Sequence, residues 1–130
     1  GWLGCTGNMT TRMKPTNDDY QKLARGPMKK VRIAFDVDGT LRCNHSDTCR
    51  DPNEDIVTLF KILAKFKNIE LYVWSGGGAR YAWAFAQKFE LPVKESHCLS
   101  KFGYDFKPDI AIDDIQETAL GVLNLIVREK

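Results

Sequence analysis

Residues 33–41, IAFDVDGTL, join an apolar run to two aspartates, a glycine and a threonine. The apolar run is typical of a buried strand, and the glycine that follows is typical of a turn. Asp36 and Asp38 are therefore expected to lie close together where the strand ends. Two carboxylates in so small a volume repel each other unless a cation or a proton relieves the repulsion. The stretch indicates either a functional site or a chance arrangement of acids.

The chain from residue 31 onward alternates between two patterns. Apolar runs predict strands over residues 31–36, 69–74, 92–96, 109–113 and 123–127. Apolar spacings of three and four predict a helix that opens at Asp51-Pro52 and ends at Asn68, and a second helix over residues 79–89. The apolar face of the first helix consists of Ile56, Leu59, Phe60, Leu63 and Phe66.

Strands that alternate with helices predict an α/β fold whose parallel sheet is covered on both faces. Right-handed crossovers favour a three-layer, doubly wound, Rossmann-like sheet with the strand order 3-2-1-4-5. Residues 28–130 form this one domain in our prediction. Residues 1–27 are interpreted as a leader or an expression-derived extension, in which residues 16–19 could cap a short helix that ends at Arg25.

Composition bounds the class of protein. The formal net charge is +2 at pH 7, which argues neither for nor against binding to nucleic acid. No apolar run is long enough to cross a bilayer, and the first residues lack the pattern of a signal peptide. Four cysteines in a domain that can build its own core do not resemble a secreted disulfide framework. We therefore expect a soluble, cytoplasmic protein without a membrane partner.

The predicted strand order brings distant acidic residues together. Strands 31–36 and 109–113 are neighbours at the switch point, where ligands bind beyond the carboxyl ends of the strands. Asp36 and Asp38 then converge with Asp113 and Asp114 on one crevice. Such a concentration of carboxylates is usually compensated by a hard divalent cation. Mg²⁺ fits best, because it keeps several waters and takes one or two carboxylates together with substrate phosphate.

A glycine-rich turn follows the strand over residues 69–74. Ser75-Gly76-Gly77-Gly78 precedes a helix and offers a hydroxyl, free backbone N–H groups and the positive end of a helix dipole. A glycine-rich turn by itself is weak evidence for phosphate binding. Its expected position beside the acidic crevice makes it a stronger indication.

These residues resemble the four motifs of the haloacid dehalogenase superfamily of phosphohydrolases. The resemblance covers most of residues 31–127 and consists of Asp36-Val37-Asp38-Gly39-Thr40, Ser75 at a strand end, a downstream lysine and Asp113-Asp114 after an apolar strand. It implies that Asp36 attacks phosphorus to form an aspartyl-phosphate, which water then hydrolyses. It also implies that Asp38 protonates the leaving oxygen in the first step and deprotonates water in the second.

The chemistry of the residue types is compatible with these roles. We assign the Mg²⁺ ligands as the Asp36 and Asp113 side chains and the Asp38 main-chain carbonyl. Asp114 completes the metal site by orienting a metal-bound water or the lysine. The Thr40 hydroxyl is expected to brace the turn by bonding the local backbone. The substrate-binding residues in this prediction are Thr40, Gly76, Gly77 and Arg80.

Three lysines are candidates for the downstream position. Lys107 stands just before the strand that Asp113 ends, which places it roughly 20 Å from the crevice at about 3.3 Å per residue. Lys101 follows the strand over 92–96 and is closer to the carboxyl ends, so we prefer it. Lys94 ranks third.

Two further groups have plainer explanations. Cys43, His45 and Cys49, with His97-Cys98, have spacings loosely compatible with structural zinc, but paired Cys-x-x-Cys knuckles are lacking. Free or incidentally paired cysteines are the favoured interpretation. Arg42 and Arg80 flank the phosphate turn and could contact a substrate, although an exposed arginine is usually a solvated charge.

The segments 41–51 and 89–101 are too short to hold a folded cap domain. An open crevice suits a bulky substrate, such as a nucleic-acid end or a phosphoprotein, or a small molecule closed over by a second subunit of a homo-oligomer. The sequence predicts a magnesium-dependent phosphomonoesterase with Asp36, Asp38, Ser75 and Lys101 as its catalytic residues. The alternatives are a polynucleotide-end or nucleotide phosphatase, and a non-catalytic metal- or phosphate-binding protein on the same fold.

Overall fold

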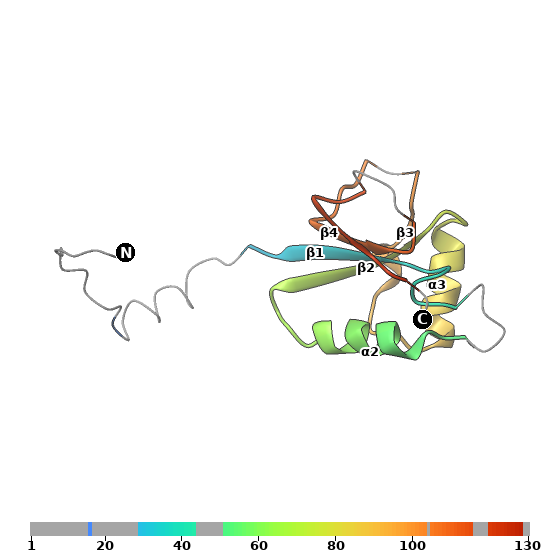
Figure 1. Cartoon of the computed structure of the whole chain (residues 1–130), viewed down its shortest axis with the longest axis horizontal. Coiled ribbons are helices and arrows are strands. Elements are labelled where there is room, and N and C mark those ends of the chain that lie inside the picture. Colours follow the sequence, from blue (N-terminus) through green and yellow to red (C-terminus); the bar gives the residue numbers. More distant parts are fainter. Residues whose placement is uncertain (1–15, 17–28, 44–50, 104, 116–119, 129–130) are drawn as a thin grey trace.

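A computed structural model of the chain describes residues 16, 29–43, 51–103, 105–115 and 120–128. Five parallel strands form one sheet with the order β3-β2-β1-β4-β5, as the sequence predicts (Figure 1). Their bounds are β1 Val31–Asp36, β2 Ile69–Ser75, β3 Cys98–Ser100, β4 Ile110–Asp113 and β5 Leu123–Ile126. The α/β, Rossmann-like class is therefore confirmed, and the described residues show no cap.

The helices α2 (Glu54–Leu63) and α3 (Ala79–Lys88) pack against the same face of the sheet (Figure 1). The core between them contains Phe35 of β1 and Phe60 of α2, whose ring centroids are 5.0 Å apart. On the opposite face, a smaller apolar cluster around Trp74 is covered by the connections that carry Phe106 and Leu120. Among the described residues, this third layer is made of connecting segments.

The third strand lies later in the chain than predicted. Residues 92–96 are not a strand, since Glu95–His97 form the 3-10 turn η1 and β3 is Cys98–Ser100. The physical reason is that the His97 N–H donates to the Lys94 carbonyl, which closes a turn, and only Cys98 comes into register with Val73 of β2. The correction matters for the site because it puts Lys101 directly after the strand.

Helix α2 is shorter than predicted at both ends. It begins at Glu54 with Asn53 as its N-cap, and the Asp51 carboxylate pairs with Arg42 instead of capping the helix. After Leu63 the chain continues in single turns, so Asn68 is not the helix end. Val57 and Phe60 are the buried residues of the helix, whereas Leu59 and Phe66, predicted to face the core, are 38% and 53% exposed.

The remaining elements agree with the prediction within one residue. Helix α3 ends at Lys88, β4 begins at Ile110 and β5 ends at Ile126. The short helix expected over residues 16–25 lies outside the described residues. No helix in the described part of the chain is long and apolar enough to cross a membrane.

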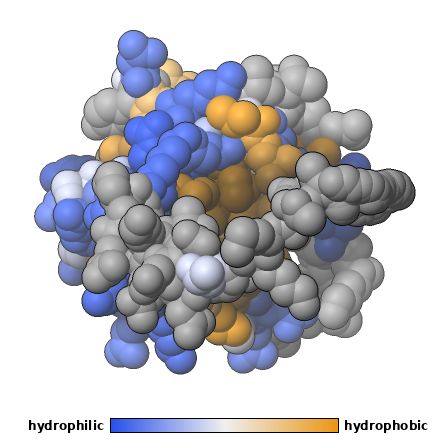
Figure 2. Space-filling view, turned by 90° about the vertical axis from the view of Figure 1, so that its left-hand side faces the viewer, coloured by the Kyte–Doolittle hydropathy of each residue, from blue (hydrophilic) through white to orange (hydrophobic). Residues whose placement is uncertain are grey.

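The two ends of the sheet differ in the kinds of side chain that they carry. Figure 2 views the end at which β1 begins and shows hydrophobic surface in the middle of that face, bordered by hydrophilic side chains. The acidic residues lie at the other end, where β1 and β4 finish. The charged groups predicted to form a site are therefore gathered at the carboxyl edge of the sheet.

Candidate functional site

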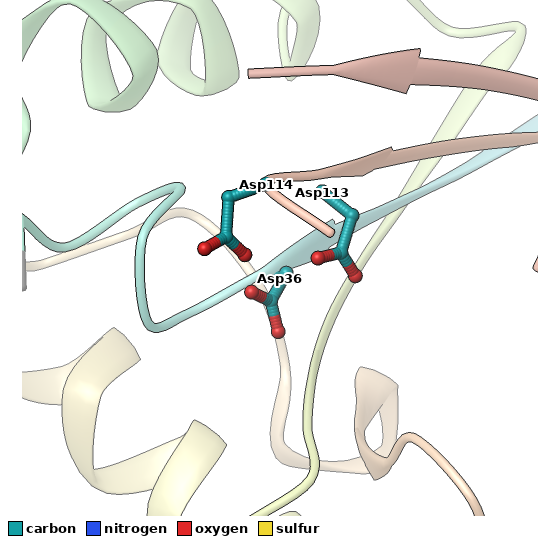
Figure 3. A group of neighbouring side chains, drawn as sticks. All are labelled: Asp36, Asp113 and Asp114. Carbon is teal, nitrogen blue, oxygen red and sulfur yellow. The ribbon is translucent and has the colours of Figure 1, made fainter. Parts of the chain in front are cut away.

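Three carboxylates from two neighbouring strands point toward one another at the carboxyl edge (Figure 3). Asp36 ends β1, Asp113 ends β4, and Asp114 follows directly. One carboxylate oxygen from each of the three lies within 4.8 Å of the other two. Asp36 and Asp113 are buried and Asp114 is half-buried. The parallel pairing of Phe35 with Ile112 fixes this meeting of residues that are far apart in the sequence.

A tight turn carries the chain from β1 across this cluster. The Leu41 N–H donates to the Asp36 carbonyl, and the Arg42 N–H donates to the Val37 carbonyl. Gly39 has φ +83°, and a Cβ at this position would overlap the Asp114 carboxylate. Glycine is therefore required both by the backbone conformation and by the close approach of an acidic side chain.

Lys101 is the lysine that reaches the acidic cluster. Its Nζ lies 3.0 Å from Asp36 Oδ1 and 2.6 Å from Asp113 Oδ2, and its side chain is buried. The Lys101 N–H donates to the Ser75 carbonyl at 2.9 Å, which anchors it at the end of β3 beside β2.

The other two candidate lysines lie elsewhere. Lys107 is exposed, and its carbonyl accepts from Arg32 near the start of β1, so it belongs to the opposite end of the sheet. Lys94 is exposed ahead of η1. Of the three, Lys101 alone contacts the carboxylates described above.

Burial and mutual repulsion raise the proton affinity of the cluster. Burial, and then the charge of Asp113, raise the pKa of Asp36 to about 7, although Lys101 opposes the shift. Burial and a hydrogen bond with Asp113 also raise the pKa of Asp114. Burial lowers the pKa of Lys101, but its bonds to Asp113 and Asp36 outweigh this effect and leave the pKa raised. The ammonium therefore stays charged and compensates only part of the acidic charge.

The glycine-rich turn lies beside Lys101. Ser75 is buried, and its Oγ accepts a hydrogen bond of 2.9 Å from the Gly77 N–H, which holds the turn closed. Gly78 has φ +107° and is the N-cap of α3, so the positive end of the helix faces the same edge. Gly76 and Gly77 are exposed, as is Arg80 in the first turn of the helix.

Thr40 does not brace the turn in the way the sequence suggested. Its hydroxyl is fully buried, and Oγ1 has no hydrogen-bond partner among the described residues. The turn is closed by backbone bonds, including one from the Thr40 N–H to the Val37 carbonyl at 3.2 Å. The expected local bond from the hydroxyl is therefore absent.

The Asp38 carboxylate lies outside the three-carboxylate cluster and contacts helix α3. Its Oδ1 accepts 2.6 Å and 3.3 Å hydrogen bonds from the Tyr81 hydroxyl and from Arg42 Nη1. Arg42 Nε in turn donates to both oxygens of Asp51 at 2.9 Å. Burial and the bond to Asp38 raise the pKa of Tyr81, so its hydroxyl stays protonated as a donor.

Tyr81 and Asp51 were not predicted as part of the site. Tyr81 has the apolar spacing of a core residue, and Asp51 precedes a proline as a capping residue would. Neither pattern contains a signal for the contact with Arg42 and Asp38. The contact depends on how α3 is rotated against the turn, which spacing alone does not specify.

Of the five candidate zinc ligands, the structure describes Cys43, His97 and Cys98. His45 and Cys49 lie outside the described residues, and Cys43 is disulfide-bonded. His97 stacks on Tyr72 with ring centroids 4.2 Å apart, and the Cys98 thiol is free and buried. These contacts place His97 and Cys98 in the packing around β2 and β3.

The donor set fits a hard divalent cation. Asp36, Asp113 and Asp114 supply oxygen ligands, and Lys101 supplies one positive charge against three carboxylates. Comparisons with protein families, curated proteins and solved structures gave no match.

Proposed function

We propose that the protein is a magnesium-dependent phosphomonoesterase of the haloacid dehalogenase type. The observation that carries the proposal is the buried Asp36 carboxylate, 3.0 Å from Lys101 and grouped with Asp113 and Asp114. Lys101 can orient the Asp36 carboxylate, and the three carboxylates together can supply oxygen ligands to a cation. The proposal is further supported by the Ser75 turn, whose exposed glycines adjoin Lys101.

In the first step of the proposed reaction, an Asp36 carboxylate oxygen forms a bond to phosphorus as the bond from phosphorus to the leaving oxygen breaks. Asp38 delivers its proton to the leaving oxygen. In the second step, Asp38 takes a proton from water while the water oxygen bonds to phosphorus and releases Asp36. The Asp38 side chain is 42% exposed, which leaves it accessible to both the leaving group and water.

Asp36, Asp113 and Asp114 would hold the cation, with the Asp38 main-chain carbonyl as a further candidate ligand. When bound, Mg²⁺ lowers the repulsion between the anionic phosphate and the carboxylate nucleophile. The N–H groups of the glycine turn, the Ser75 hydroxyl and the Lys101 ammonium would bind the phosphate oxygens. These groups approach from β2 and β3, whereas the nucleophile comes from β1.

The proposal is tested by measuring phosphate release from a broad panel of phosphomonoesters with and without Mg²⁺. The panel includes 5′-phosphorylated oligonucleotides, which separate a polynucleotide-end phosphatase from one that acts on small molecules. We expect Asp36→Asn to lower kcat/KM by at least about 1,000-fold, because the substitution removes the nucleophile. Asp105→Asn is the matched control, since Asp105 is exposed.

Equal rates for wild type and Asp36→Asn across the panel would contradict the proposal. Such a result, combined with Mg²⁺-dependent binding of phosphate, would favour the non-catalytic binding protein.

A further inference from the structure

We propose that a groove along helix α3 holds the leaving group of the substrate and selects phosphomonoesters whose leaving group carries an aromatic ring. This inference rests on the proposed function, since it assigns the part of the substrate that departs from phosphorus. The groove has a volume of about 260 Å³. It is lined by Arg42, Asp51, Tyr81, Ala84, Phe85, Lys88 and Phe89.

One face of α3 and the end of that helix form the floor of the groove. Five lining residues lie on one side of this helix, because successive members are separated by three, one, three and one positions. They are Tyr81, Ala84, Phe85, Lys88 and Phe89. At about 1.5 Å per residue, the floor extends roughly 12 Å from Tyr81 toward the C-terminal end of the helix. Arg42 and Asp51 form the facing wall.

The groove adjoins the proposed acid through two of its lining residues. Tyr81 and Arg42 line the groove, and both donate hydrogen bonds to Asp38 Oδ1. The leaving oxygen must lie within hydrogen-bond reach of Asp38 to receive its proton. In this proposal, the group attached to that oxygen extends past Tyr81 and Arg42 into the groove. Tyr81 also adjoins the phosphate turn, since a Cβ on Gly77 would lie 3.2 Å from the Tyr81 ring.

The lining is suited to an aromatic ring. Three of the seven lining residues that the structure describes are aromatic, and the Phe85 and Phe89 rings pack with centroids 4.8 Å apart. An inserted ring can stack on or meet the edge of such rings with favourable geometry. The volume equals that of roughly nine waters at about 30 Å³ each, which is enough for a single ring system.

The charges of the lining favour a neutral or electron-rich ring over a cationic one. Arg42 is paired with Asp38 and Asp51, so its charge is compensated within the protein. Lys88 is exposed, and its Nζ lies 5.3 Å from the centroid of the Phe89 ring at the outer end of the groove. Among the lining residues, the excess charge is therefore positive and lies at the far end from Asp38.

Two chemical sources provide such a leaving group, namely aryl alcohols such as tyrosine and the nucleosides. The experiment compares kcat/KM with Mg²⁺ for phenyl phosphate, phosphotyrosine, nucleoside 5′-monophosphates and glycerol phosphate. The variant Ala84→Trp fills the groove from its floor. The matched control is Gln87→Trp, which adds the same side chain at an exposed position of α3 outside the groove.

We expect wild type to prefer aromatic esters over glycerol phosphate by at least about 10-fold, a typical effect of burying one apolar side chain. Ala84→Trp should reduce that ratio about 10-fold, and Gln87→Trp should leave it unchanged. The measurement also identifies which of the two sources supplies the leaving group. It is the class of ester, aryl or nucleoside, that has the highest kcat/KM in wild type and a lower kcat/KM in Ala84→Trp. The inference is wrong if wild type shows no aromatic preference, or if both tryptophan variants change the ratio equally.

A binding measurement separates this inference from the proposed reaction. Calorimetry with Mg²⁺ compares phenylphosphonate with methylphosphonate, neither of which can be hydrolysed to an alcohol. A preference for the phenyl compound that Ala84→Trp removes supports the groove, even if no ester is turned over and the proposed function fails. Turnover of esters without any preference for the phenyl compound supports the proposed function and contradicts the inference that the groove binds the leaving group.

Discussion

At the residue scale, Lys101 places a positive charge in contact with two buried carboxylates of the site. The Lys101 ammonium contacts Asp36 and Asp113, and all three side chains are buried. Removing one partner of a buried ion pair leaves an uncompensated charge, which is costly because neither water nor the protein solvates it. A lysine in this position both holds the fold together and orients the proposed nucleophile.

Replacing this lysine should therefore affect stability and activity together. We expect Lys101→Met to lower the free energy of unfolding by about 3 kcal/mol, the usual cost of breaking a buried ion pair. We also expect kcat/KM to fall by at least about 100-fold, since phosphate and Asp36 lose the same cation. Urea unfolding and kinetic assays measure the two effects. Lys107→Met is the control, because Lys107 is exposed at the far end of the sheet. Equal stability of the two variants would contradict the assigned role of the ion pair.

The raised pKa of Asp36 predicts how stability depends on pH in metal-free protein. The pKa moves from 3.8 to about 7, so between these values the folded state binds more protons than the unfolded chain. The free energy of unfolding should then decrease as pH rises through this window, by on the order of 4 kcal/mol, since one pKa unit is worth about 1.4 kcal/mol and the shift is about three units. Urea unfolding at several pH values measures the slope.

Asp36→Asn should flatten this slope because it removes the titrating group. Excess Mg²⁺ should also reduce the slope, because bound cation favours the ionised carboxylate. Identical slopes for wild type and Asp36→Asn would show that Asp36 is not the group responsible.

At the element scale, the turn after β1 and the strand β3 show what the sequence could and could not specify. The IAFDVDGTL pattern predicts the β1 end and the turn because the apolar run and the glycine are local signals. The sequence predicts the third strand too early because Cys98-Leu99-Ser100 is selected by its pairing with β2, a long-range contact that no local pattern reports. Long-range register outweighs local propensity for a strand of three residues.

Alanine substitution of two glycines tests whether the turn after β1 makes a specific contact with Asp114. Gly39 and Gly78 both have positive φ, but a Cβ would overlap Asp114 at Gly39 and would meet nothing within 4 Å at Gly78. Gly78→Ala should cost about 1–2 kcal/mol of unfolding free energy from backbone strain alone. Gly39→Ala should cost more, and it should weaken Mg²⁺ binding because Asp114 must move. Calorimetric Mg²⁺ titration and urea unfolding separate the two effects. Equal losses in both variants would exclude a specific contact between the turn and Asp114.

At the scale of the whole molecule, the strand order assembles the site. Asp36, Ser75, Lys101 and Asp113 end or follow four neighbouring strands, and parallel pairing brings all four to one edge. This convergence could be predicted from the alternation of strands and helices. The link from Tyr81 and Arg42 to Asp38 could not, because it depends on the rotation of α3 over the sheet. The same rotation places the α3 groove next to the proposed acid.

The proposed function requires Asp36 to act as a covalent nucleophile in a magnesium-dependent hydrolysis. The most direct measurement mixes protein, Mg²⁺ and the best phosphomonoester, stops the reaction with acid during turnover, and locates phosphoryl groups on peptides by mass spectrometry. We predict a phosphoryl group on Asp36 in wild type and none there in Asp36→Asn, with hydrolysis lost in the variant. Turnover by wild type with no phosphoryl group on Asp36, together with unchanged hydrolysis by Asp36→Asn, would contradict the account.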